Sequence, residues 1–141
     1  MATDTLEIVL SDGPAKEAYD VILKGLVAYN EQQAGDGGHS PLTVYVKDGE
    51  RILGGLSGAI YMRWLYIELF HLPKSLRGAG LGTRLMRAAE AEAARRGCVG
   101  VHLNTFDFQA RGFYEKLGYE LYGTLEGYPP GGRRFSMFRR L

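Results

Sequence analysis

Hydrophobic and polar positions follow two periods along this chain. From Leu81 onward, apolar residues recur every three or four positions, which predicts an amphipathic helix that ends near Gly97. A similar period predicts an earlier helix from about Ala15 to Gln33. The apolar stripe of the later helix excludes Glu90 and the arginines and consists of Leu81, Leu85, Ala88, Ala89 and Ala93.

Runs of β-branched and aromatic residues, separated by turn residues, predict the strands. Asp48-Gly49 marks a hairpin, and Gly54, Gly55 and Gly58 indicate a bulge or a close backbone approach in its second strand. A short helix is expected over Gln109–Leu117. The expected strands are Leu6–Leu10, Thr43–Val46, Ile52–Ile60, Trp64–Leu72, Val99–Thr105, Tyr119–Leu125 and Phe135–Phe138, the last pairing with the one before it.

A glycine-rich turn lies between the central strand and the long helix, with the sequence Arg77-Gly78-Ala79-Gly80-Leu81-Gly82. A strand followed by glycines that open a helix gathers backbone N–H groups and the positive end of the helix dipole. This arrangement predicts a site for a phosphate or pyrophosphate. The glycine spacing fits neither the dinucleotide fingerprint nor a Walker loop.

The same stretch resembles the Arg/Gln-x-x-Gly-x-Gly/Ala signature of the GNAT superfamily of acetyl-CoA-dependent N-acetyltransferases, at Arg77, Gly80 and Gly82. A second match follows downstream, where Phe113–Tyr119 is similar to the Phe/Leu-Tyr-Glu-Lys-Leu-Gly-Phe/Tyr segment of that family. Further segments resemble a bacterial subgroup whose members mostly have no assigned substrate. The resemblance covers roughly Leu42 to Leu141.

The resemblance implies one α/β (α+β) domain over residues 1–141. Its sheet would be mixed and mostly antiparallel, splayed at the fourth strand near Leu72 and flanked by about four helices. The implied activity is transfer of an acetyl group from acetyl-CoA to a primary amine by direct attack, and the acceptor is either a small-molecule amine or a protein amine. The alternatives are a catalytically degenerate domain that binds acyl-CoA as a sensor, or an interaction module.

The resemblance also implies the residues that bind acetyl-CoA. The backbone of Phe70 and Leu72 would bond the pantetheine arm. Asp107 stands where many members have an asparagine that contacts this arm; an ionised aspartate cannot donate a hydrogen bond, so Gln109 or Asn104 is the alternative donor. The pyrophosphate would lie on the backbone amides of Arg77, Gly78, Ala79, Gly80, Leu81, Gly82 and Thr83.

Two residues are the implied catalytic groups. Tyr114 corresponds to the tyrosine that protonates the leaving thiolate in many members, with core packing as the alternative. Glu68 matches a glutamate used as a base through water, and is otherwise a structural carboxylate. Strand alternation places His71 on the face opposite Glu68, where a packed or surface role is expected.

Other side chains have plainer interpretations. Cys98 is expected to be a small buried hydrophobe. The arginines among residues 133–140 are expected on the solvent face of the last strand, and Tyr128–Gly132 is expected to wall the acceptor pocket.

Composition limits the class of partner. The chain has 141 residues, 45% of them hydrophobic, and a net charge of +1, which favours neither nucleic acid nor an anionic membrane. Its one cysteine, and an N-terminus without a basic and then apolar stretch, predict a cytoplasmic protein without disulfide, metal or membrane span. Trp64 and Tyr66 make a homodimer possible.

Overall fold

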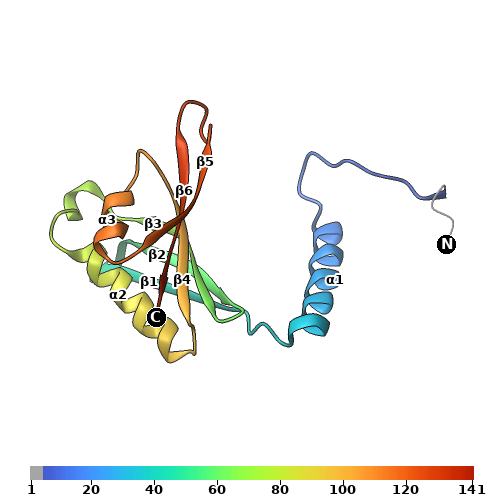
Figure 1. Ribbon diagram of the computed structural model, residues 1–141, viewed down its shortest axis with the longest axis horizontal. Coiled ribbons are helices and arrows are strands. Elements are labelled where there is room, and N and C mark those ends of the chain that lie inside the picture. Colours follow the sequence, from blue (N-terminus) through green and yellow to red (C-terminus); the bar gives the residue numbers. More distant parts are fainter. Residues whose placement is uncertain (1–4) are drawn as a thin grey trace. The chain divides into compact units, whose positions relative to one another are not determined.

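The computed structural model describes residues 5–141, which divide into one unit up to Asp36 and a second from Gly37 to Leu141 (Figure 1). The first unit contains α1 (Lys16–Ala34). The second contains β1 (Ser40–Asp48), β2 (Arg51–Tyr61), β3 (Trp64–His71), the 3₁₀ turn Lys74–Leu76, α2 (Leu81–Arg95), β4 (Gly100–Phe106), α3 (Arg111–Lys116), β5 (Glu120–Glu126) and β6 (Arg133–Arg140).

In the first unit, the predicted helix forms but the predicted strand does not. α1 is continuous through Gly25. Residues 6–10 form no strand, so that prediction is wrong: five weakly alternating residues do not specify a strand without a hydrogen-bonded neighbour. The described residues hold three α-helices rather than about four. That the whole chain forms a single domain stays a prediction.

The second unit is built on a six-stranded sheet with the order β1-β2-β3-β4-β6-β5. Only β3 and β4 are parallel, joined by the crossover through α2, so the sheet is mixed and mostly antiparallel as predicted. The β5–β6 pairing is confirmed. The sequence did not indicate that β6 also lies between β5 and β4.

A bulge in the β2–β3 pair changes which side chains of β3 face the core. Ser57 pairs with Leu69 and Gly58 with Ile67, which leaves Glu68 without a partner in the ladder. A side chain at Gly58 would overlap the carbonyl of Tyr66, so glycine is required here, as the sequence predicted. Because the bulge shifts the alternation by one, Phe70 and Leu72 pack with the core after it, as Leu65 and Ile67 do before it.

The core lies between α2 and the sheet. α2 buries Leu85, Met86, Ala89 and Ala93, which confirms most of the predicted stripe, although Ala88 is exposed. Glu90 is also buried, with only 4% of its surface exposed, so its predicted place outside the stripe is wrong. A buried carboxylate requires partners, because desolvation penalises an unpaired charge.

Those partners come from α2 itself, from β6 and from the segment between α3 and β5. Glu90 accepts a 2.7 Å hydrogen bond from the Tyr119 hydroxyl and a 2.7 Å bond from Arg87. Arg139 of β6 lies 3.0 Å from the same carboxylate. Arg87 also donates to the carbonyl of Leu117, just beyond α3. This cluster, the Glu90 network, therefore ties α2, β6 and the end of α3 together.

Glu90→Gln should destabilise the second unit strongly, by about 2–4 kcal/mol, because the arginine and tyrosine donors lose the buried anion that they share. Urea unfolding followed by circular dichroism measures the change. Glu92→Gln is the matched control, since Glu92 is on the same helix and pairs with Arg95 and Arg96 in solvent. Equal, small effects of both substitutions would show that the network contributes nothing to stability.

Candidate functional site

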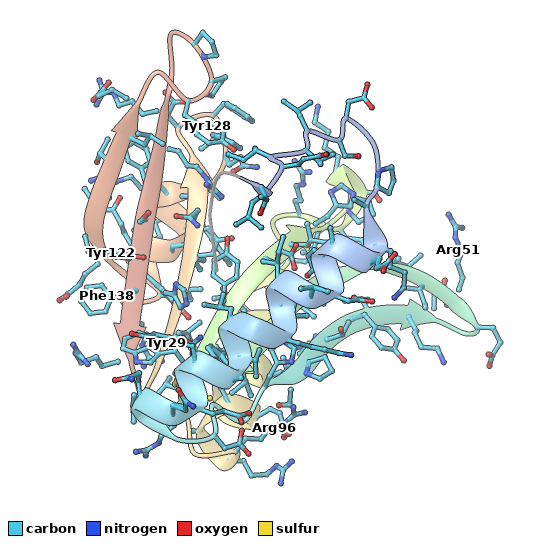
Figure 2. The ribbon with its side chains drawn as sticks, turned by 90° about the vertical axis from the view of Figure 1, so that its right-hand side faces the viewer. Tyr29, Arg51, Arg96, Tyr122, Tyr128 and Phe138 are labelled. Carbon is cyan, nitrogen blue, oxygen red and sulfur yellow. The ribbon has the colours of Figure 1, made fainter. Side chains whose placement is uncertain are left out.

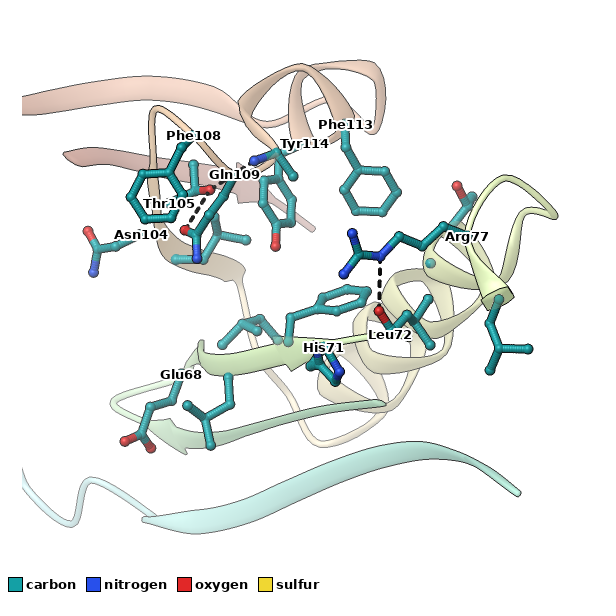
Figure 3. Close-up of a pocket in the computed structure, with 18 of the residues that line it drawn as sticks. Glu68, His71, Leu72, Arg77, Asn104, Thr105, Phe108, Gln109, Phe113 and Tyr114 are labelled. Atoms are coloured by element: carbon teal, nitrogen blue, oxygen red, sulfur yellow. Dashed lines mark hydrogen bonds between the residues drawn. The ribbon is translucent and has the colours of Figure 1, made fainter. Parts of the chain in front are cut away.

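The strands β3 and β4 separate at one end, and a cavity lies at the separation. They pair from Trp64 with Gly100 to Ile67 with Leu103, and no further. Beyond that point the edge of β3 that faces β4 has no neighbouring strand. The cavity, of about 790 Å³, is lined by residues of β3, the glycine turn, β4 and α3 (Figure 3). The predicted splay of the sheet is thus confirmed. It begins at Glu68, a few residues before the expected position at Leu72. It lies on the third strand rather than the fourth, because the first predicted strand does not form.

The start of α2 presents unused backbone donors to this cavity. Residues 78 to 83 donate to no backbone carbonyl within the described chain; the first such bond is from Arg84 to Gly80. Gly78 and Gly80 have φ angles of 85° and 82°, which glycine adopts without strain. A Cβ at either position would meet nothing within 4 Å. The turn therefore fits an anionic group that approaches the backbone closely.

Arg77 fixes this turn against the end of β3. Its Nε donates a 2.9 Å hydrogen bond to the carbonyl of Leu72 (Figure 3). Phe70 packs edge-on against Phe113 of α3, with ring centroids 6.0 Å apart. The cavity is lined by the four residues just named, Phe70, Leu72, Arg77 and Phe113, and by Gly78, Gly80, Gly82 and Thr83. Ala79 and Leu81 belong to the turn but do not line the cavity.

Tyr114 points from α3 into the cavity and is 7% exposed (Figure 3). Its backbone carbonyl accepts from Leu117 and Tyr119, which closes the end of α3. No hydrogen bond joins its hydroxyl to another described residue. Burial raises the pKa of Tyr114 to about 12, so the phenol remains protonated at physiological pH. The group can therefore donate a proton inside the cavity.

Glu68 lies at the other side of the cavity, at the bulge, and is exposed (Figure 3). Solvent reaches its carboxylate, which suits proton transfer through water. The expected placement of His71 opposite Glu68 does not hold, because the bulge interrupts the alternation. Both residues are exposed, away from the core side that Phe70 and Leu72 occupy.

The structure engages Asp107 elsewhere. Its carboxylate accepts a 3.0 Å bond from the N–H of Arg133, and its own N–H donates to the Arg133 carbonyl. Asp107 thus anchors the β5–β6 hairpin and does not line the cavity. Gln109 and Asn104 do line it.

The amide groups of Gln109 and Asn104 are held differently. The Gln109 side-chain oxygen accepts from the Phe106 N–H at 2.7 Å and from the Thr105 hydroxyl at 3.3 Å. Its NH₂ group has no partner among the described residues. The Asn104 NH₂ group donates to the Tyr66 hydroxyl at 3.1 Å. Gln109 is therefore the better placed donor toward a ligand.

Several cavity residues were not singled out by the sequence. Phe108 is 69% exposed at the cavity and stacks on Phe106, at 5.2 Å between ring centroids. The signal was two phenylalanines on either side of Asp107 in a predicted turn.

Cys98, by contrast, is buried as predicted, and burial raises the pKa of its thiol, which disfavours a reactive thiolate.

Residues 5–141 contain neither a cluster of metal-binding side chains nor a helix that could cross a membrane. In that range no three His, Cys, Asp or Glu side chains are grouped so that they could hold a metal ion. None of the helices there has the length and hydrophobicity that crossing a bilayer requires.

Comparison with known proteins agrees with this geometry. The model of the Acetyltransferase (GNAT) family matches residues 10–119. The blasticidin-S acetyltransferase of Streptomyces morookaense is 46% identical over 96 residues, which are 64% of this chain and 71% of that protein.

Solved structures agree as well. The crystal structure of an acetyltransferase from Agrobacterium tumefaciens superposes with a TM-score of 0.90 at 33% identity, covering 96% of this chain and 100% of that one. An aminoglycoside 6'-N-acetyltransferase solved with coenzyme A shares the fold, with a TM-score of 0.64 at 20% identity over 96% of this chain and 97% of its own.

The family match covers most of the chain, and the cavity joins the predicted phosphate-binding turn to the predicted acid. The chain therefore belongs to the GNAT acetyltransferase family, the acetyl-CoA-dependent N-acetyltransferases.

Proposed function

We propose that this protein moves the acetyl group of acetyl-CoA to the primary amine of a small molecule by direct attack. One observation supports this most strongly: a single cavity joins the unused N–H groups of the α2 start, the unpaired edge of β3 and the Tyr114 hydroxyl. A ligand with a phosphate at one end and a reactive group at the other can span these three features.

The chain's own groups would hold acetyl-CoA along this path. Backbone amides of residues 78 to 83 bind its pyrophosphate, helped by the dipole of α2. The Arg77 N–H already donates to the Lys74 carbonyl, so the expected contact from this amide is not part of the proposal. The β3 edge at Phe70 and Leu72 offers backbone donors and acceptors to the amides of the pantetheine arm. Gln109 donates its free NH₂ group from the other side. A direct contact from Asp107 stays a prediction, which its bond to Arg133 does not favour.

Proton transfer is divided between two residues. Glu68 takes, through water, the proton that the amine loses as its nitrogen bonds to the acetyl carbon. Tyr114 gives its proton to the sulfur as the carbon–sulfur bond breaks, and recovers one from solvent. A phenol with a pKa raised to about 12 is a weak acid, but a thiolate that leaves into a largely buried cavity is a strong acceptor.

A small acceptor is supported by one relative, the blasticidin-S acetyltransferase of Streptomyces morookaense. We propose that the acceptor here is likewise a small amine rather than a protein. An acyl-CoA sensor without transferase activity remains the alternative that the tests below address. The cytoplasmic location and the homodimer stay predictions.

Gly80→Ala should weaken acetyl-CoA binding about tenfold, because a side chain disfavours the left-handed backbone that starts α2 and displaces its N–H groups. Gly97→Ala is the matched control: Gly97 has a φ of 86° at the other end of the same helix and an equally open surrounding. Both should cost stability in urea unfolding, about 1 kcal/mol. Calorimetry should show weaker acetyl-CoA binding for Gly80→Ala alone. Equal acetyl-CoA affinities of the two variants would show that the N–H groups at the start of α2 do not bind the ligand.

Tyr114→Phe should lower kcat about a hundredfold or more, while the Kd of acetyl-CoA changes little, since only the proton donor is removed. Thiol release with blasticidin S and other small amines measures kcat, and calorimetry measures Kd. Because the pKa of Tyr114 is about 12, the wild-type rate should not fall from loss of this proton below about pH 10. Tyr122→Phe, on exposed β5, is the control. An unchanged kcat in Tyr114→Phe would rule out the acid role.

Glu68→Gln should lower kcat/KM about a hundredfold near pH 7, because the amide cannot take the proton that the amine loses. Glu50→Gln, in the exposed β1–β2 turn, is the control. An unchanged kcat/KM in Glu68→Gln would show that another group is the base. Acetyl-CoA binding with no thiol release from any amine would favour the sensor.

A further inference from the structure

Three aromatic side chains form an exposed surface where β4 ends and the β5–β6 hairpin turns. Phe108 stacks on Phe106 with 7° between the ring planes, and Tyr128 packs against Phe106 with centroids 5.1 Å apart. Phe108 and Tyr128 remain 69% and 44% exposed. We call these three residues the aromatic platform. Figure 2 shows Tyr128 beyond the labelled pair Tyr122 and Phe138, toward the turn of the hairpin.

Arg134 lies against this platform. It pairs with Phe106 across β4 and β6, and its guanidinium carbon lies 5.1 Å from the centre of the Tyr128 ring and 5.7 Å from that of Phe106. Two other arginines of β6 have carboxylate partners: Arg133 has Glu126 and Arg139 has Glu90. Within residues 5–141, no carboxylate lies within 4 Å of Arg134. Its positive charge therefore faces ring surfaces and has no anion.

The platform adjoins the cavity on the acceptor side. Phe108 is itself a lining residue, as are Asn104 and Glu68. Thr105 and Phe135 are buried toward the helices, so their neighbours Phe106 and Arg134 point to the opposite face of the sheet. Tyr114 and the α2 start are on the helix side. A molecule on the platform would thus reach the cavity from the side opposite the proposed acetyl-CoA site.

We propose that the acceptor amine also carries a flat unsaturated ring and an anionic group, such as a carboxylate. The ring stacks on Phe108 and Tyr128, because aromatic faces favour offset stacking with a second flat ring. The anion pairs with Arg134, whose planar N–H groups match a carboxylate. The amine then lies toward Glu68. This inference rests on the proposed function and adds the chemical class of the acceptor.

Three commercially available amines test the ring and the anionic group separately. 4-(Aminomethyl)benzoate has the ring, the carboxylate and the amine. Benzylamine lacks the carboxylate, and trans-4-(aminomethyl)cyclohexanecarboxylate replaces the flat ring by a saturated one. Thiol release from acetyl-CoA by the full chain should give a kcat/KM for the first amine about tenfold or more above that of each of the others.

Variants assign each preference to its residue. Arg134→Gln should remove the advantage of 4-(aminomethyl)benzoate over benzylamine and leave benzylamine turnover unchanged. Phe108→Leu should remove the advantage over the cyclohexane analogue. Arg133→Gln is the control. Arg133 neighbours Arg134, but its guanidinium pairs with Glu126, so this variant should keep both preferences. Acetyl-CoA affinity, measured by calorimetry, should be the same in all three variants.

The outcomes separate this inference from the proposed function. Turnover of all three amines at similar kcat/KM, or preferences that persist in Arg134→Gln and Phe108→Leu, would overturn the acceptor class and leave the transferase intact. Turnover of an amine that lacks a flat ring or an anionic group, but of none of these three, would also overturn it. Absence of acetyl-CoA binding would instead overturn the proposed function.

Discussion

The separation of β3 from β4 is the constraint on which the rest of this structure depends. Parallel pairing lasts from Trp64 to Ile67 and ends where the bulge leaves Glu68 outside the ladder. Since backbone N–H and C=O groups require partners, an unpaired strand edge inside a sheet must be satisfied by water or by a ligand. The amide-containing arm of acetyl-CoA supplies such groups. We therefore propose that the opening is a binding site, since a ligand there would satisfy the unpaired backbone groups as a neighbouring strand does elsewhere in the sheet.

The rest of the second unit holds this opening in place. β2 pairs with β3 on its other edge as far as His71, and β6 pairs with the whole of β4. Arg77 ties the glycine turn to Leu72, and the Glu90 network ties the end of α3 to α2 and β6. These contacts hold the walls of the cavity in place.

In the proposed reaction, burial divides the two proton transfers between the two sides of the sheet. Tyr114 is almost completely buried on the helix side, which raises its pKa and keeps its proton available to a leaving group. Glu68 is open to solvent at the bulge, where a proton taken from an amine can leave through water. The aromatic platform and Arg134 are on this second side. The acetyl donor and its acceptor would thus approach from opposite faces through one gap.

The sequence by itself determined the elements whose signals are local. Glycines at Gly78, Gly80 and Gly82, the periodicity that follows Leu81 and the Phe113–Tyr119 segment predicted the turn, the long helix, the family and the candidate acid. These features depend on backbone conformation and residue spacing within a few turns of chain, which is why they can be read from residues close together.

Only the tertiary structure decided what depends on partners far apart in the chain. Glu90 is buried because Arg87, Tyr119 and Arg139 converge on it, and its position on α2 alone predicted the opposite. Asp107 bonds Arg133 rather than facing the cavity, β6 inserts between β4 and β5, and the bulge places His71 off its expected face. The physical reason is the same in each case: pairing and desolvation are set by neighbours that only the fold brings together.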